Sequence, residues 1–241
     1  MASPFSNISP VVKNLLIINL ICFLPSLYFT HNFATNYDPV ANYLGLHYFD
    51  APNFGAWQII TYMFLHGGWT HILFNMFALF SFGPILEYTI GSKKFFTLYF
   101  ACGIGAAILQ LLVQGYEVHA MIGSLTYPNP SLDINTYYQF GVHGQQMYDI
   151  YLGSTVGASG AIFGVVVAFA MLYPNMELMI LFIPVPVKAK YVIPVYCIFE
   201  LFMGVEQFAG DNVAHFAHIG GALIGFIMIK AWGLKSPDRY M

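Results

Sequence analysis

Charged residues are what this sequence has least of. Only 8% of its 241 residues are Asp, Glu, Lys or Arg, whereas soluble domains carry about 25%. Hydrophobic residues make up 58% of the chain and aromatic residues 18%. So few charges cannot cover a surface that faces water, so the composition predicts an all-α protein that crosses a membrane several times.

Basic runs and cysteine frameworks are also absent. Without a basic segment the chain offers no footprint for nucleic acid, and we expect no nucleic-acid partner. Cys22, Cys102 and Cys197 lie in apolar segments and form no CxxC pair, which argues against disulfides and cysteine metal sites. Lys13 precedes an apolar stretch that ends near Phe29 with no clean cleavage site, so we expect a retained first helix rather than a cleaved signal.

Apolar segments long enough to cross a bilayer are, by contrast, abundant. A helix of roughly 20 residues spans the hydrocarbon layer. Six such segments lie near residues 11–30, 70–90, 94–114, 155–173, 188–206 and 213–232. We therefore expect one six-helix membrane domain over residues 1–241, with long outer loops at 31–69 and 115–154.

The basic residues give this arrangement an orientation. With six spans, all of them fall on one side of the membrane: Lys13, Lys93, Lys94, Lys188, Lys190, Lys230, Lys235 and Arg239. Because basic residues gather on the cytoplasmic side, both termini should be cytoplasmic and both long loops external. We expect an integral protein of the cell (inner) membrane.

A serine among small residues opens the fourth span, in Gly157-Ala158-Ser159-Gly160. Ser159 is either a nucleophile inside the bilayer or a small residue that lets helices approach. A nucleophile needs a base within hydrogen-bond reach.

The sixth span offers that base. His218 shares one helix face with Ala214, Gly221, Ala222 and Gly225. The fourth span carries Gly157, Gly160 and Gly164, so the two helices can pack closely and bring His218 near Ser159. The alternative is that His218 only bonds a neighbouring helix.

No carboxylate is expected to orient this histidine. Asp211 is two turns away, and Glu200 and Glu206 belong to the fifth span or its end. We therefore predict a Ser–His dyad rather than the usual triad.

Two hydrogen-bond donors lie on the second span. His71 and Asn75 are four residues apart and share a helix face. Both can stabilise a developing oxyanion, or they can simply bond another helix, as His66 also can. Glu87, near the cytoplasmic end of the span, has a structural role in this interpretation.

Together these motifs resemble the rhomboid family of intramembrane serine proteases. They are His-Ile-Leu-Phe-Asn at 71–75, Glu-Tyr-Thr-Ile-Gly at 87–91, Gly-Ala-Ser-Gly at 157–160 and Ala-His-Ile-Gly-Gly-Ala-Leu-Ile-Gly at 217–225. The resemblance implies a rhomboid-like six-helix bundle with Ser159 as nucleophile and His218 as base. It places His71, Asn75 and the Ser159 backbone N–H at the oxyanion, gives Glu87 a structural place, and requires no cofactor or metal.

The function implied is that of a serine endopeptidase that cleaves transmembrane helices near the outer membrane face. Its partners would be the lipid bilayer and protein substrates with small residues near the cut; the oligomeric state is not indicated. One alternative is a non-catalytic rhomboid-like protein that binds membrane clients. Another is a metal or haem protein using His66, His71, His215 and His218, but HExxH is absent and no carboxylate is expected near them.

Two residues depart from the family pattern. Gln58 follows Trp57 where the family often has arginine, and we expect this loss of a cation to loosen the first outer loop. Phe163 stands where a tyrosine often follows the serine by four, which keeps an aromatic ring under His218 but removes a hydroxyl. The loop 115–154 is also longer than in many members.

Overall fold

The computed structural model describes residues 8–32, 38–133, 135–180, 183–206 and 213–237. Asp211 and Arg239, which entered the sequence analysis, lie outside these residues, as does part of the outer loop 31–69. The described chain is mostly helical, which confirms the predicted all-α class. A single two-stranded hairpin is the exception among the described residues.

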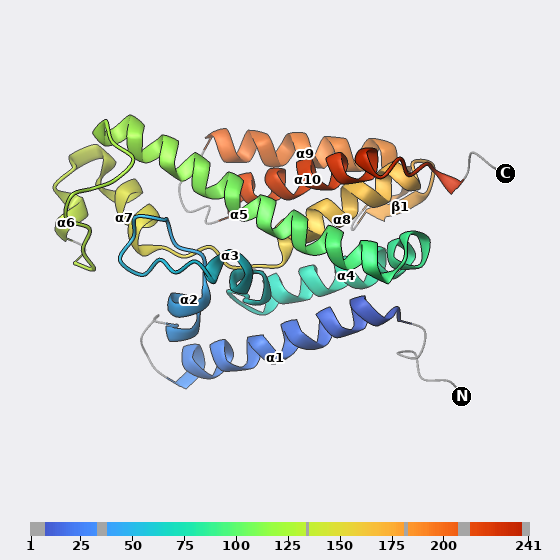
Figure 1. Ribbon diagram of the computed structural model, residues 1–241, viewed down its shortest axis with the longest axis horizontal. Coiled ribbons are helices and arrows are strands. Elements are labelled where there is room, and N and C mark those ends of the chain that lie inside the picture. The colour runs from blue at the N-terminus through green and yellow to red at the C-terminus, as the bar shows by residue number, and fades with distance from the viewer. Residues whose placement is uncertain (1–7, 33–37, 134, 181–182, 207–212, 238–241) are drawn as a thin grey trace.

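A helix occupies each of the six predicted segments, and the six lie side by side as a bundle (Figure 1). They are α1 (Pro10–Asn32), α4 (Trp69–Ile90), α5 (Ser92–Ile122), α8 (Ser159–Leu172), α9 (Ala189–Glu206) and α10 (His215–Ala231). By length and composition α1, α4 and α5 can each cross a membrane, while α8 and α10 are shorter apolar helices. That all six cross stays a prediction.

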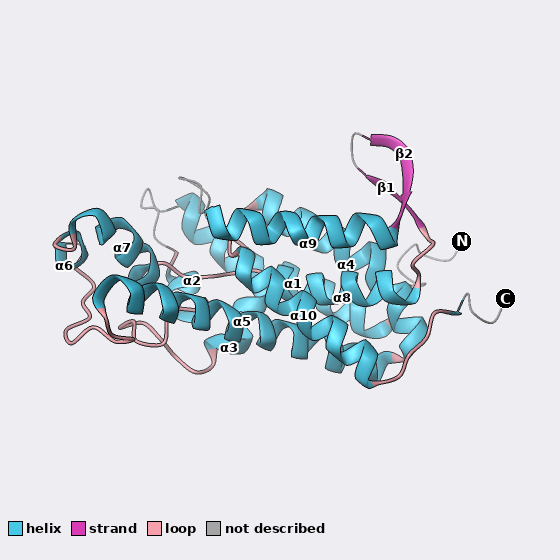
Figure 2. Ribbon diagram, turned by 90° about the horizontal axis from the view of Figure 1, so that it is seen from above, coloured by secondary structure: helices cyan, strands magenta, loops and turns pink. Residues whose placement is uncertain are grey.

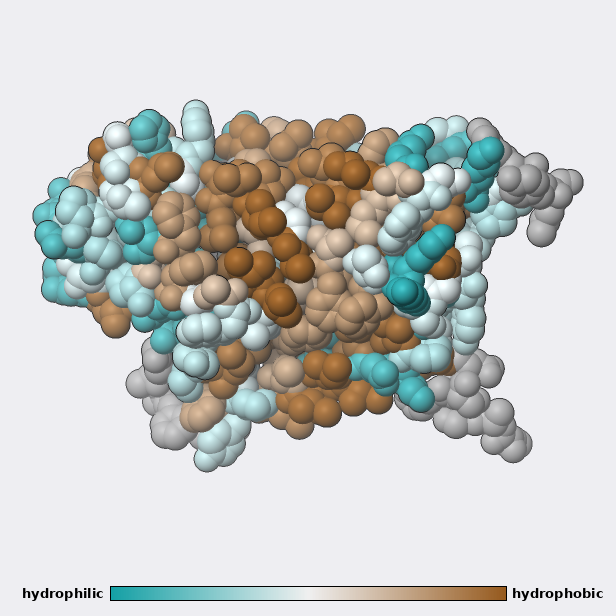
Figure 3. Space-filling model, viewed as in Figure 1, coloured by the Kyte–Doolittle hydropathy of each residue, from teal (hydrophilic) through white to brown (hydrophobic). Residues whose placement is uncertain are grey.

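The two ends of the bundle differ. The start of α1 and the end of α10 lie at the end where β1 is seen, and the loops that carry α2, α6 and α7 lie at the other end (Figure 1). Hydrophobic residues cover the middle of the visible face, and hydrophilic residues gather toward its ends (Figure 3). This banding fits an integral membrane protein, whose surface must be apolar where it meets lipid.

Several boundaries differ from the prediction. Helix α5 continues eight residues past position 114, to Ile122, and α8 begins at Ser159 rather than at residue 155. Residues 155–158 are not helical because Thr155 pairs with Leu46 through backbone hydrogen bonds of 2.8 and 2.9 Å.

A β-hairpin, which was not predicted, joins α8 to α9. Strands β1 (Glu177–Ile180) and β2 (Ile183–Lys188) pair antiparallel and project beyond the helices (Figure 2). Proline interrupts helices but is tolerated in an edge strand, where its missing N–H faces no partner. The prolines of β2 therefore fit this short ribbon better than a helix.

The outer loops contain short helical pieces rather than open coil. The first holds α2 (Pro39–Leu44), α3 (Gln58–Thr61) and the 3₁₀ turn η2 (Tyr62–Phe64); the second holds α6 (Asn135–Tyr138), the 3₁₀ turn η3 (Gly141–His143) and α7 (Gly144–Leu152).

The long second loop folds back onto the first. Tyr48, Tyr137 and Tyr151 are fully buried in a small core of their own. Asp50 of the first loop accepts hydrogen bonds from the Tyr151 hydroxyl and the Tyr127 N–H, both at 2.8 Å. Burial raises the pKa of Tyr48 to about 12. The loop 115–154 is therefore long enough to cover the first loop as a cap.

The expectation that Gln58 loosens the first loop is wrong. Its side chain is fully buried and donates hydrogen bonds to the carbonyls of Asn53 and Tyr43 at 2.8 and 3.2 Å. It also accepts one from the His47 N–H at 3.2 Å. An uncharged amide can donate and accept at once, so it ties three loop segments together where a cation could only donate.

Helices α8 and α10 approach each other very closely. A Cβ atom added at Gly221 would be 1.8 Å from the Gly160 carbonyl oxygen, and one added at Gly225 would be 2.4 Å from that of Gly164. Only glycine fits such an approach, which confirms the predicted packing of these two small-residue faces. This close approach fixes how far α8 and α10 are shifted along each other.

Candidate active site

Ser159 is the first residue of α8, and the segment before it fixes its position. The Gly157 N–H donates to the Tyr62 carbonyl at 2.9 Å. Gly157 has a φ of 138°, a conformation that only glycine adopts readily. Helix α8 has 14 residues, about 21 Å of rise, which is shorter than the hydrocarbon layer. Helix α8, which begins at Ser159, is therefore too short to cross the layer without displacing the membrane boundary or starting below it.

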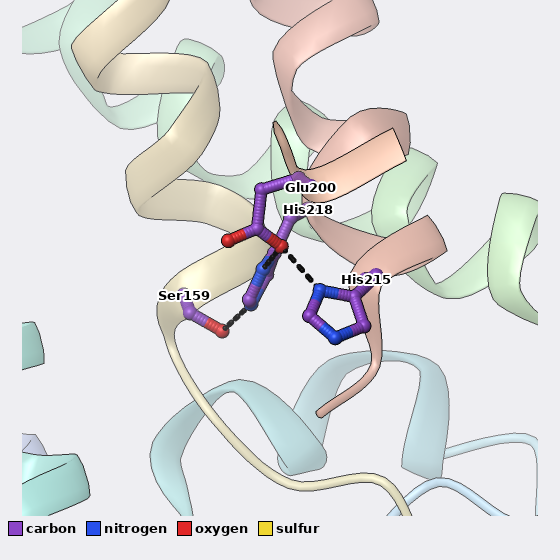
Figure 4. Close-up of polar contacts among 4 residues, drawn as sticks. All are labelled: Ser159, Glu200, His215 and His218. Carbon is purple, nitrogen blue, oxygen red and sulfur yellow. Dashed lines mark hydrogen bonds and ion pairs between the residues drawn. The ribbon is translucent and has the colours of Figure 1, made fainter. Parts of the chain in front are cut away.

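His218 of α10 meets this serine directly. Its Nε2 lies 2.7 Å from the Ser159 Oγ (Figure 4). The Phe163 ring stacks on the imidazole with centroids 4.4 Å apart and planes 8° from parallel. The structure thus confirms both the predicted approach of the two residues and the aromatic packing that Phe163 retains.

A carboxylate does orient this histidine, contrary to our expectation. The Glu200 Oε2 lies 2.7 Å from the His218 Nδ1, on the far side of the ring from Ser159 (Figure 4). A carboxylate only accepts hydrogen bonds, so His218 carries its proton on Nδ1 and leaves Nε2 free to accept from the serine. The three side chains form one hydrogen-bond chain across α8, α9 and α10, where we had predicted a dyad.

His215 shares the same carboxylate oxygen. Its Nδ1 also lies 2.7 Å from Glu200 Oε2, so one oxygen serves two imidazoles. Glu200 is 4% exposed and His215 9%. Potential ligand atoms of Glu200, His215 and His218 all lie within 4.8 Å of one another. The premise that no carboxylate clusters with the histidines is therefore also wrong.

The predicted oxyanion residues lie beside the serine. His71 is half-buried and close to Gly157, since a Cβ added there would be 2.8 Å from the His71 Nε2. The Gly67 N–H donates weakly, at 3.4 Å, to His71 Nδ1, which leaves Nε2–H as a donor toward the site. Asn75, one turn further along α4, is 6% exposed.

The remaining polar candidates lie apart from this chain of contacts. His66 is buried and packs edge-on against His71 with ring centroids 5.1 Å apart. Burial and the neighbouring His71 lower the pKa of His66 to about 3. Glu87 accepts from the N–H groups of Val11 and Val12 at 3.0 Å and from Ser92, so it holds the start of α1 against α4.

One large cavity connects these groups. It has a volume of about 1110 Å³ and is lined mainly by apolar side chains. Its polar lining includes Ser159, His218, Glu200, His215, His71 and Asn75. A few convergent polar groups in an apolar cavity are typical of ligand and active sites.

Comparisons with known proteins point to one family. The family model described as a rhomboid domain matches residues 53–234. The rhomboid protein YdcA of Bacillus subtilis is 29% identical over 240 residues, which cover 98% of this chain and 95% of YdcA. The rhomboid protease AarA of Providencia stuartii is 29% identical over 190 residues, covering 73% of this chain and 56% of AarA. The rhomboid protease GluP of Bacillus subtilis is 29% identical over 184 residues, covering 76% of this chain but only 27% of GluP.

Proposed function

This chain belongs to the rhomboid family, and we propose that it is an intramembrane serine endopeptidase with Ser159 as its nucleophile. The observation that carries the proposal is the 2.7 Å contact between Ser159 Oγ and His218 Nε2. A serine hydroxyl is a weak nucleophile until a base takes its proton. Named relatives that are rhomboid proteases support the same activity.

In the acylation step His218 takes the Ser159 proton on Nε2 while Oγ attacks the scissile carbonyl carbon. The tetrahedral intermediate collapses when His218 gives that proton to the leaving amine, which releases one half of the substrate. Water then enters, loses a proton to His218 and hydrolyses the acyl-enzyme. Ser159 recovers its proton at the end of the cycle.

The negative oxygen of the intermediate would be held by donors already present at the site. His71 Nε2–H, the Asn75 amide and the Ser159 N–H, which is free at the first turn of α8, line or adjoin the cavity. Donors fixed before the reaction stabilise developing charge strongly when bulk water is excluded.

Glu200 acts as a positioning residue in this scheme. By accepting from Nδ1–H it keeps His218 in the tautomer that can serve as base, and it stabilises the imidazolium that forms. At this site Glu200 contacts His218 and His215 rather than Ser159, so its effect on Ser159 passes through His218. Replacing it should lower turnover far more than substrate binding.

The substrate would be a transmembrane helix that unwinds into the cavity. A peptide bond inside an intact helix is shielded, so helices with small residues near the cut are the best candidates. The cavity lies toward the end of the bundle that we expect to face outside, where water for hydrolysis is available. Lipid is the other partner, since the middle of the bundle presents an apolar surface (Figure 3).

The test is labelling of the detergent-solubilised protein with a fluorophosphonate probe, paired with cleavage of a single-span substrate. We expect the wild type to be labelled and to cleave, and Ser159→Ala and His218→Ala to do neither. Glu200→Gln should fold and bind substrate but turn over about 10²–10⁴-fold more slowly. Glu206→Gln, on the same helix but exposed, is the matched control.

Two results would argue against the proposal. If cleavage survives Ser159→Ala, Ser159 is not the nucleophile. A folded wild type that binds transmembrane clients but neither labels nor cleaves would favour the non-catalytic client-binding alternative.

A further inference from the structure

We propose that Glu200, His215 and His218 form a zinc-binding site whose occupation switches off the protease. Two imidazole nitrogens and one carboxylate oxygen are a ligand set that Zn²⁺ takes in many proteins, with an open fourth position left to water. All three side chains are buried, and all three line the cavity. The inhibitory effect rests on the proposed function, whereas the binding does not.

The ligand atoms are close to the required spacing. Glu200 Oε2 lies 2.7 Å from each Nδ1, and the potential ligand atoms of the three residues lie within 4.8 Å of one another. Zinc bonds of about 2.0–2.2 Å place tetrahedral ligands about 3.3 Å apart. To bind zinc, the carboxylate oxygen has to withdraw by about 0.6 Å from each nitrogen. The ligand atoms that lie farthest apart have to close by up to about 1.5 Å.

The charge of the cluster also favours a cation. Glu200 is 4% exposed, and within the described ranges its ion-pair partners are histidines rather than lysine or arginine. The described lysines lie near the starts of α1, α5 and α9 and near the end of α10, at the end of the bundle where β1 is seen. A buried carboxylate is costly unless a positive partner or a metal compensates it.

Zinc at this position would inactivate the base through its tautomer. The metal takes the lone pair of His218 Nδ1, so the single proton of the neutral imidazole moves to Nε2. Nε2–H can then only donate to Ser159 Oγ, 2.7 Å away, and cannot accept the serine proton. His215 undergoes the same proton shift, and the carboxylate changes only its partner, so no other reactant is needed.

The first experiment measures fluorophosphonate labelling of the purified protein at buffered concentrations of free Zn²⁺. We expect saturating zinc to slow labelling at least about 100-fold, and a chelator to restore it. Mg²⁺ at the same concentrations should have no effect, because it prefers an oxygen-rich octahedral shell. His215→Gln, compared with its own zinc-free rate, should raise the inhibitory zinc concentration at least about tenfold. His143→Gln, at an exposed histidine of the outer loop, should leave it unchanged.

A binding measurement separates this inference from the proposed function. Equilibrium dialysis of Ser159→Ala protein against Zn²⁺ should give one ion per chain, and the ion should be lost in Ser159→Ala/His215→Gln and in Ser159→Ala/Glu200→Gln. Thermal melting establishes that each variant is folded, and either second variant suffices if the other is not. Three results would overturn the inference. They are zinc binding that survives both changes, the absence of any zinc binding, and labelling that zinc slows equally in His215→Gln. Stoichiometric, His215-dependent binding to a protein that is never labelled would support the site and reject only the proposed protease.

Discussion

The contact between Gly160 and Gly221 should make the site unusually sensitive to one methyl group. A Cβ atom at Gly221 would lie 1.8 Å from the Gly160 carbonyl oxygen, whereas real Cβ contacts essentially never fall below 3.0 Å. The Gly221→Ala substitution therefore forces α8 and α10 apart by about 1.2 Å. Gly160 follows Ser159 directly, and Gly221 lies one turn after His218.

This separation acts on the hydrogen bond between Ser159 and His218, which activates the serine in the proposed mechanism. Adding it to a 2.7 Å contact between Ser159 Oγ and His218 Nε2 carries the pair beyond hydrogen-bond distance. A misplacement of about 1 Å can cost an enzyme about 100-fold in rate, which is the loss we expect in labelling of Ser159. Overpacking should also destabilise the fold by about 1–3 kcal/mol.

The assay compares fluorophosphonate labelling rates and melting temperatures for Gly221→Ala and a matched control. Gly115→Ala is that control, because its new Cβ, in the second half of α5, would find its nearest neighbour at 3.6 Å, an ordinary contact. We expect the control to label at the wild-type rate. If Gly221→Ala also labels at that rate, close packing of α8 on α10 does not set the geometry of the site, and the reasoning is wrong.

Three further substitutions test other parts of the structure. Gly157→Ala places a Cβ 2.8 Å from His71 Nε2 at a φ of 138°, so substrate turnover should fall at least about tenfold. Normal turnover would show that the position of His71 does not matter for the reaction. Gln58→Leu removes three hydrogen bonds made by a fully buried side chain and should lower the free energy of unfolding by about 2–3 kcal/mol, measured by thermal melting. Burial lowers the pKa of His66 to about 3, while the unfolded imidazole titrates near about 6.5. The unfolded state therefore binds more protons between these values, and stability falls as the pH drops through this window. His66→Gln should lose less melting temperature than the wild type between about pH 7 and pH 4.5; equal losses would contradict the argument.

Much of this site could be predicted because its signals are local. Glycines spaced along two helices predict a close approach, and His218 shares its helix face with Gly221 and Gly225. That pattern brings the imidazole to Ser159 without knowledge of any other element. The start of α8 was less predictable, since it depends on the pairing of Thr155 with Leu46, which are distant in sequence.

The long-range contacts of the outer loops could not be derived in the same way. Asp50 and the Tyr151 hydroxyl that it accepts from are 101 residues apart. Neither residue stands in a periodic pattern, and loop closure over such a distance leaves many pairings open. The cap formed by the second loop is therefore a result of the structure alone.

Glu200 is different, because the sequence did contain a signal for it. An ionisable residue inside an apolar span is costly and is a functional candidate by default, and Glu200 stands in the middle of α9. What the sequence did not supply was the rotation of α9 that points this side chain at α10. The separation of 18 residues between Glu200 and His218 did not by itself indicate that the two side chains meet.

The energetics of the cluster explain why its three members depend on one another. An isolated carboxylate with 4% exposure would destabilise the fold, yet replacing Glu200 by an apolar residue would take away the acceptor of two Nδ1–H groups. Breaking a buried polar set by removing one partner costs more than the set contributes when complete. The hydrogen bond to Glu200 therefore favours the His218 tautomer with its proton on Nδ1. In the proposed protease, Nε2 is then ready to accept the Ser159 proton before any substrate enters the cavity.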